Sequence, residues 1–181
     1  MISHAKKDAS VLSIIIRTEQ KADFTAVDRL IGAAFAGKPY SSGTEGLIAQ
    51  ALRASGDLTL SLIAERQGEI VGQIMFSPVI INEAPSSWHC LGPVAVSPQC
   101  QKEGIGSRLI EEGLARLRAT GSHGCVLVGD PGYYSRFGFR PVLALSARDV
   151  PAEYFQVLPF ETDVPVGTLD FHPAFETSSA D

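Results

Sequence analysis

Apolar positions at the start of the chain predict a strand followed by two helices. Residues 11–17 are β-branched and mostly apolar over a short stretch, which is typical of a strand. From Asp23 the apolar positions recur every three or four residues, as on one face of a helix. A Gly- and Ser-rich loop follows, and the same period then returns in a second helix. Glu45 falls in the first turn of that helix, and Gly56 is placed to end it.

The middle of the chain predicts a hairpin, a third strand and a long helix. Strands are expected over residues 58–65 and 70–80, because a short polar turn with a glycine joins these two apolar runs. A further strand over residues 88–96 is interrupted by Gly92-Pro93, which predicts a bulge. A helix beginning at Ile105 presents its apolar residues on one side.

The last third of the chain predicts shorter elements separated by irregular segments. A wholly apolar strand is expected over residues 125–128, as when both faces of a sheet are covered. A helical turn is expected from Tyr133 to Arg136, and a strand is expected to begin at Phe137–Phe139. Three prolines then predict irregular structure, with a last strand near residues 166–171. This order of elements indicates one mixed α/β layer structure.

Length, charge and cysteine content narrow the class of protein without naming a reaction. A chain of 181 residues with 45% apolar residues suits one domain, here residues 11–175, between flexible tails at 1–10 and 176–181. The net charge of −5 argues against a dedicated nucleic-acid binder. No segment suits a membrane span or a signal peptide, so we expect a cytoplasmic protein. The three cysteines form no C-x-x-C pair, so neither a metal site nor a disulfide framework is expected.

A glycine-rich loop, Gln101-x-x-Gly104-x-Gly106, separates a predicted strand from the long helix. Glycines leave backbone N–H groups uncovered, and a helix N-terminus attracts anions, so the loop is suited to hold a phosphate. A glycine-rich helix start without a ligand is the alternative, because this motif is weak on its own. A dinucleotide fingerprint fails because Leu109 stands where a third glycine is required. A Walker-type loop fails because no lysine follows Gly106.

A second motif, Tyr134-x-x-x-Gly138-Phe139, follows the next predicted strand. With the strand Leu91–Pro98 and the loop Gln101–Ser107, its order and spacing resemble the GNAT superfamily of acyl-CoA-dependent N-acetyltransferases. The resemblance extends in element order from about residue 11 to residue 175. It implies a mixed, mostly antiparallel central sheet that is flanked by helices and splayed between its fourth and fifth strands.

The resemblance also implies an activity, the transfer of an acetyl group from acetyl-CoA to a primary amine by direct attack. The glycine-rich loop would hold the CoA pyrophosphate, and the preceding strand would pair its backbone with the pantetheine arm as an added strand does. Tyr134 would protonate the departing thiolate. The cofactor-binding residues implied are Val94, Ala95, Val96, Gln101, Lys102, Glu103, Gly104, Ile105, Gly106 and Ser107.

Direct transfer requires an acceptor amine that has lost its proton. A free amine has a pKa of about 10.4, so a base or a desolvating site is needed. Glu45 lies in the region that faces the acceptor in this fold and is the candidate base; the alternative is a carboxylate that complements the helix dipole. Asp130 is the rival base, with capping of a helix as its alternative. A chain of water molecules is a third route for the proton.

Glu103 departs from the family pattern, in which a small or basic residue often precedes the first loop glycine. A carboxylate near a pyrophosphate should weaken CoA binding. The hypothesis is that Lys102 compensates for this charge.

The acceptor and the assembly stay open at this point. A small molecule or a peptide would supply the amine, and a homodimer is expected only because dimers are common in the family. The alternative function is a non-catalytic acyl-CoA-binding sensor on the same fold. A Tyr134→Phe variant distinguishes the two, since an enzyme would lose turnover and keep its affinity for CoA.

Overall fold

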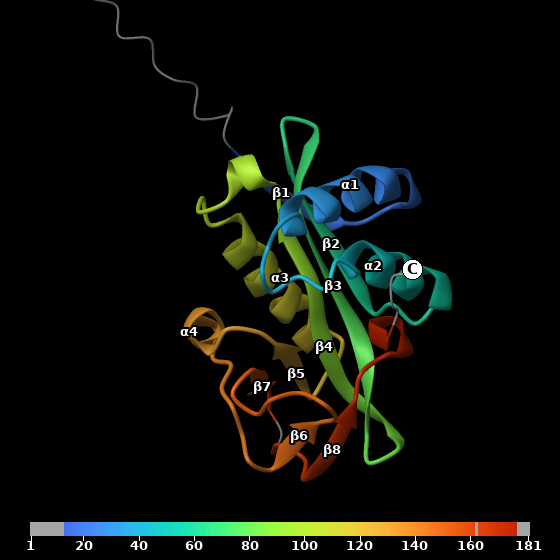
Figure 1. Ribbon diagram of the computed structural model, residues 1–181, viewed down its shortest axis with the longest axis vertical. Helices are drawn as coiled ribbons and strands as arrows, with labels where there is room; N and C mark the ends of the chain where they lie inside the picture. Colours follow the sequence, from blue (N-terminus) through green and yellow to red (C-terminus); the bar gives the residue numbers. More distant parts are fainter. Residues whose placement is uncertain (1–12, 162, 177–181) are drawn as a thin grey trace, which may run out of the picture.

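The computed structural model describes residues 13–161 and 163–176, and within them one mixed sheet of eight strands carries the fold. Its main path runs β1-β2-β3-β4-β5-β7, and β8 joins the lower end of β3 to β6 (Figure 1). The strands are β1 (Ile15–Thr18), β2 (Leu60–Arg66), β3 (Glu69–Ile81), β4 (Ala84–Val96), β5 (Gly124–Val128), β6 (Leu145–Ala147), β7 (Phe155–Pro159) and β8 (Gly167–Asp170). The helices are α1 (Phe24–Phe35), α2 (Glu45–Ser55), α3 (Ile105–Ala119) and α4 (Pro131–Tyr134), and 3₁₀ turns lie at Lys21–Asp23, Pro98–Cys100, Ser135–Phe137 and Pro173–Glu176.

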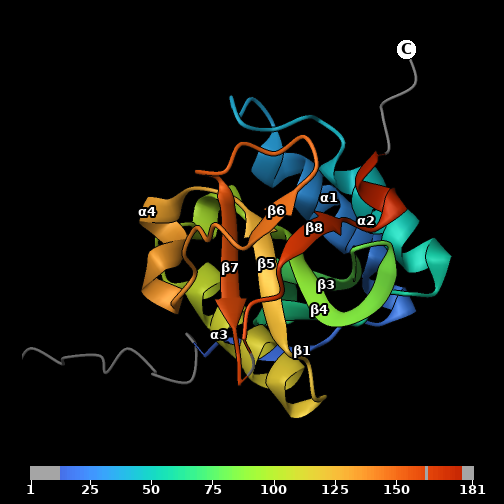
Figure 2. The same cartoon turned by 90° about the horizontal axis from the view of Figure 1, so that it is seen from below.

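Helices cover both faces of the sheet, with α3 on one side and α1 and α2 on the other (Figure 2). Alternate residues of a strand therefore enter different cores. Ile74 and Phe76 of β3 pack against α3, whereas Met75 between them packs against α1 and α2. Burial on both faces explains why the central strands are almost continuously apolar in the sequence.

The sheet has the predicted splay between its fourth and fifth strands. Neighbouring strands are antiparallel except for the parallel pairs β4–β5 and β6–β8. The β4–β5 pair extends only from Trp88 to Cys90 on β4, opposite Gly124–Val126 on β5. Beyond these residues β4 stays paired with β3, and β5 stays paired with β7. The fold class expected from the sequence is thus confirmed.

Most predicted elements are confirmed, but the C-terminal third required correction. The three long helices and the hairpin between β2 and β3 form where expected. The strand expected at Phe137–Phe139 is absent from the described residues: Ser135–Phe137 is a 3₁₀ turn, and only an isolated bridge joins Arg140 to Val157. The region of irregular structure instead contains β6 and β7. Residues 1–12 and 177–181, with most of both predicted tails, lie outside the described residues.

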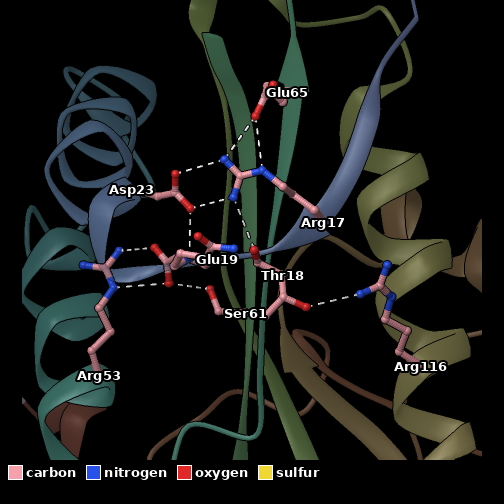
Figure 3. A network of polar contacts seen from close by, with 9 residues as sticks. Arg17, Thr18, Glu19, Asp23, Arg53, Ser61, Glu65 and Arg116 are labelled. Carbon is pink, nitrogen blue, oxygen red and sulfur yellow. Dashed lines mark hydrogen bonds and ion pairs between the residues drawn. The ribbon is translucent and has the colours of Figure 1, made fainter. Parts of the chain in front are cut away.

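A network of ion pairs fastens the edge strand β1 to the helices beside it (Figure 3). Arg17 bridges Asp23 at 2.7 Å and Glu65 at 3.0 Å, so it joins β1 to the start of α1 and to β2. Arg53 of α2 contacts Glu19 at 2.6 Å, and its side chain is only 7% exposed. Buried charges of this kind are tolerated because each one has a partner.

No helix in residues 13–161 and 163–176 is long and apolar enough to cross a membrane.

Candidate active site

The opening between β4 and β5 begins at a bulge in β4. The ladder pairs Ile74 with Val94 and Phe76 with Leu91, so Gly92 and Pro93 together face one residue of β3. Such a bulge bends the strand and turns backbone groups away from the ladder. Gly92 has φ of +152°, a conformation that residues with a side chain rarely adopt.

Two side chains contact this bulge from the face that α1 and α2 cover. Gln73 is fully buried on β3, and its Nε2 donates a hydrogen bond to the Pro93 carbonyl at 3.1 Å. Phe175, in the C-terminal 3₁₀ turn, lies 3.8 Å from the position that a Cβ on Gly92 would occupy. The bulge is therefore held by a polar contact from within the sheet and by an apolar contact from the end of the chain.

The free edge of β4 can receive an extended ligand. Ser97 N–H bonds the Val71 carbonyl, and residues along an antiparallel ladder alternate between bonded and non-bonded pairs. The N–H and C=O groups of Val94 and Val96 therefore point away from β3, toward the opening. One acceptor on this edge already has a hydrogen bond: the Nε2 of Gln101 donates to the Val96 carbonyl at 3.1 Å. An extended chain that binds here would add to the sheet as a strand does.

The loop before α3 has the geometry of an anion-binding site. Lys102 (φ +66°) and Gly104 (φ +82°) are both left-handed, and α3 begins at Ile105. Among the residues that the structure describes, no acceptor bonds the N–H groups of Lys102, Glu103 or Gly104. Free N–H groups in such a turn, together with the helix N-terminus, suit a phosphate. Gly106 completes the loop, and Tyr133 Oη lies 3.4 Å from the position of a Cβ there.

Glu103 pairs with Arg66, a residue that the hypothesis of compensation by Lys102 did not include. Arg66 Nη1 contacts Glu103 Oε2 at 2.5 Å, and Arg66 Nη2 contacts Cys100 Sγ at 2.6 Å. Arg66 ends β2, beside the hairpin at the same end of the sheet as the glycine-rich loop. The carboxylate is thus neutralised from a neighbouring strand rather than from within the loop.

Tyr134 lies on the short helix α4, which follows β5 in the chain. Asp130 caps this helix by accepting a hydrogen bond from Gly132 N–H at 2.9 Å, which agrees with capping as the role of this residue. Gly129 makes room for the aromatic ring, since a Cβ there would lie 2.5 Å from Tyr134 Cε2. Burial raises the pKa of Tyr134, and Tyr133, Cys90, Tyr40 and Cys125 are near enough to raise it further.

No carbonyl or carboxylate in residues 13–161 and 163–176 accepts a hydrogen bond from the Tyr134 hydroxyl. The phenol is therefore half-buried, protonated at neutral pH and free to donate a hydrogen bond.

Glu45 is the first residue of α2, where its carboxylate orders the loop that leads into the helix. It accepts hydrogen bonds from Ser41 Oγ at 2.9 Å and from Ser42 N–H at 3.0 Å. It also lines a groove of about 510 Å³ between α1 and α2, with Asp28 and Lys38 among the other lining residues. Within the described residues, Glu45 makes no hydrogen bond or ion pair with Tyr134 or with the bulge. Tyr40, from the same loop, packs on Phe35, which lines the groove, and is among the residues that raise the pKa of Tyr134.

The cysteines near the opening are buried thiols with raised pKa values. Cys90 and Cys125 are buried on the two diverging strands, and burial raises the pKa of the Cys90 thiol to about 12. Burial likewise raises the pKa of Cys125 well above its usual value. His89 Nδ1 lies 2.8 Å from Ser122 Oγ, and burial lowers the pKa of this histidine. In the described residues, no group of three or more His, Cys, Asp or Glu side chains could hold a metal ion.

Sequence reasoning missed two residues that contact the site. Gln73 carried a signal, because it is a lone amide in the otherwise apolar run of β3. Arg66 carried no signal in the sequence, because a charged residue beside a hairpin turn is common. Its contact with Glu103 forms only because the folded sheet places the hairpin next to the glycine-rich loop.

Comparison with known proteins gives one consistent family. The profile of a family described as "Acetyltransferase (GNAT) domain" matches residues 15–142. The uncharacterised N-acetyltransferase YhbS of Escherichia coli (strain K12) is 35% identical over 127 residues, which cover 70% of this chain and 73% of YhbS.

Two solved structures share the fold over nearly the whole chain. A GNAT family acetyltransferase from Brucella melitensis, solved in complex with acetyl-CoA, is 47% identical with a TM-score of 0.81, and the match covers 90% of this chain and 98% of that one. YhbS from Escherichia coli, solved in complex with CoA, is 30% identical with a TM-score of 0.84, and the match covers 91% and 92% of the two chains.

Proposed function

The chain belongs to the GNAT acetyltransferase family, and we propose from this that it transfers an acetyl group from acetyl-CoA to a primary amine. Family membership makes it an acyltransferase. The observation that carries the more specific proposal is the half-buried Tyr134 hydroxyl, which has no acceptor in the described residues and is near enough to Cys90 of β4 and Cys125 of β5 for both to raise its pKa. The complexes of two relatives with acetyl-CoA and CoA support the choice of donor.

The donor would bind along β4 and the loop before α3. Backbone groups of Val94–Val96 would pair with the pantetheine arm, and the N–H groups of Gln101–Ser107 would hold the pyrophosphate. The free N–H groups of this loop and the outward-facing groups of Val94 and Val96 fit such a ligand. When bound, acetyl-CoA supplies an activated acetyl thioester, and the residues described here hold it in place.

Tyr134 would act as the general acid. A phenol is protonated at neutral pH, which is the form that can give a proton to a leaving thiolate. In this proposal the hydroxyl would lie beside the sulfur of the bound thioester. Backbone N–H groups of the splayed strand, such as that of Val94, would stabilise the negative charge that develops on the carbonyl oxygen, an effect worth about 3 kcal/mol for each donor.

Glu45 would receive the proton of the acceptor amine. Its groove also contains Asp28, so the acceptor side of the molecule can attract an ammonium group. The acceptor would be a small-molecule or peptide amine. A Glu45→Gln variant with unchanged kcat and KM for every accepted amine would remove this residue from the mechanism.

Direct attack agrees with the state of the cysteines. A covalent acyl-enzyme on Cys90 or Cys125 would need a thiolate, but burial keeps these two thiols protonated at neutral pH. The acetyl group would therefore pass from sulfur to nitrogen in one transfer.

The deciding experiment compares wild type with Tyr134→Phe in an amine-library assay that detects released CoA thiol. We expect wild type to release CoA with at least one class of amine. The variant should lose about 100-fold or more in kcat and keep its CoA dissociation constant. If wild type binds CoA and releases none with any amine, the protein is a sensor. Equal turnover by both proteins would contradict the role of Tyr134.

A further inference from the structure

The glycine-rich loop is held from outside by one arginine. Arg66 is the last residue of β2, and its guanidinium reaches two positions that flank the left-handed Lys102. It contacts Cys100 Sγ before that residue and the Glu103 carboxylate after it, at 2.6 and 2.5 Å. The Arg66 side chain is 21% exposed and that of Glu103 is 45% exposed, so the pair lies at the surface without being fully hydrated.

The position of Glu103 makes this contact consequential. Its own N–H and those of Lys102 and Gly104 are the free donors of the loop, so the side chain starts from the middle of the candidate phosphate site. A free carboxylate there would repel an anion and could also fold back onto the same N–H groups. The Arg66 guanidinium offsets the negative charge of Glu103, so the repulsion of an anion is reduced. It also holds the carboxylate on the side of the hairpin, away from the N–H groups of the loop.

We propose that Arg66 is a positioning residue for CoA binding, which keeps the Glu103 carboxylate off the pyrophosphate site of residues 101–107. This inference rests on the proposed function, since it requires the loop to bind the pyrophosphate. Arg66 itself need not touch the ligand. Its effect is exerted through Glu103, and it should disappear when Glu103 has no charge.

A double-mutant cycle tests the proposal with CoA itself as the probe. Dissociation constants are measured by titration calorimetry for wild type, Arg66→Met, Glu103→Gln and the double variant. Arg66→Met should weaken CoA binding about fivefold, the upper range for a partly exposed ion pair, and less at high salt. Glu103→Gln alone and the double variant should bind within about twofold of wild type. Pantetheine, which lacks the phosphates, should bind all four proteins equally.

Two further variants separate this role from general damage. Arg148→Met removes an exposed arginine that pairs with Asp170 at 3.1 Å, far from the loop, and should leave CoA binding unchanged. Arg66→Lys keeps the charge without the two-pronged contact and should fall between wild type and Arg66→Met. If Arg66→Met fails to fold, the Arg66→Lys and Glu103→Gln pair gives the same comparison.

Each remaining outcome decides a different claim. Three results would overturn the role of Arg66 and leave the proposed function intact. The CoA dissociation constants could be equal in all variants, or the affinity that Arg66→Met loses could fail to return when Glu103→Gln is added. The third is a loss of affinity for pantetheine as large as that for CoA. A wild type that binds no CoA would overturn both.

Discussion

At the scale of single residues, the site depends on where side chains are missing as well as on where they are present. Gly129 allows the Tyr134 ring to lie against the chain, and Gly106 allows Tyr133 to approach the start of α3. Neither glycine has a positive φ. At Gly129 the requirement is therefore space rather than conformation, whereas a Cβ on Gly106 would make only ordinary contact with Tyr133. A substitution at Gly129 therefore tests the placement of Tyr134 directly.

Gly129→Ala should displace the Tyr134 ring and lower kcat by about 100-fold, the loss expected for a misplaced catalytic group. The crowding should also cost about 1–3 kcal/mol of stability. Gly113→Ala is the matched control, because a Cβ there would overlap the Phe76 ring in the core and leave Tyr134 untouched. Chemical denaturation and steady-state kinetics on both variants check this prediction, which equal kcat values for the two would contradict.

The raised pKa of Tyr134 predicts a change in stability at alkaline pH. Below pH 10 the phenol is neutral in the folded and unfolded chains, so it contributes no pH dependence. Above pH 10 the unfolded chain ionises first, and wild type should lose up to about 1.4 kcal/mol per pH unit relative to Tyr134→Phe. Unfolding free energies of both proteins between pH 8 and 11 measure this difference. A constant difference over that range would mean that the hydroxyl is exposed.

At the scale of elements, the ion-pair network of Figure 3 determines how α1 and α2 lie against the edge of the sheet. Arg53 of α2 joins Glu19, which follows β1, to Asp28 of α1. Ser61 of β2 donates a hydrogen bond to the same Glu19 at 2.7 Å. Arg53 thus joins α2 to α1, and the buried Glu19 carboxylate joins α2 to β2.

Arg53→Met should lower the free energy of unfolding by about 3–5 kcal/mol, because it leaves Glu19, whose side chain is 2% exposed, buried without its counter-ion. The double variant Arg53→Met/Glu19→Gln should recover a large part of this loss. Arg148→Met is the control for an exposed pair and should produce no measurable change. Equal stability of Arg53→Met and wild type in urea would rule out a structural role for the network.

Helices and strands whose apolar residues recur at a regular spacing could be predicted from the sequence. Strands that form only because a partner strand lies beside them could not. The apolar stripe of α3 marks the helix whatever lies opposite. β7 is only five residues long and ends in Pro159, and it exists because β5 offers it an edge. The candidate site divides in the same way. The loop and Tyr134 are local motifs, whereas the Arg66–Glu103 contact joins residues 37 positions apart.

At the scale of the whole molecule, ligand binding should be visible in the stability of the fold. CoA at a hundred times its dissociation constant adds about 2.7 kcal/mol, which raises Tm by about 5–10 °C for a chain of this length. Hydrogen exchange should slow most at Val94, Val96 and Lys102–Ser107, whose N–H groups would bond the ligand. NAD at the same concentration is the control. An equal Tm shift with NAD would contradict the assignment of the loop to CoA.

The contact of Phe175 with Gly92 brings the last turn of the chain to the bulge beside the proposed reaction centre. Purification handles and fusion partners therefore belong at the amino end, because cargo appended after residue 181 would start only a few residues from this contact. Trimming the carboxy end before Pro173 would remove the Phe175 ring from its contact with the bulge.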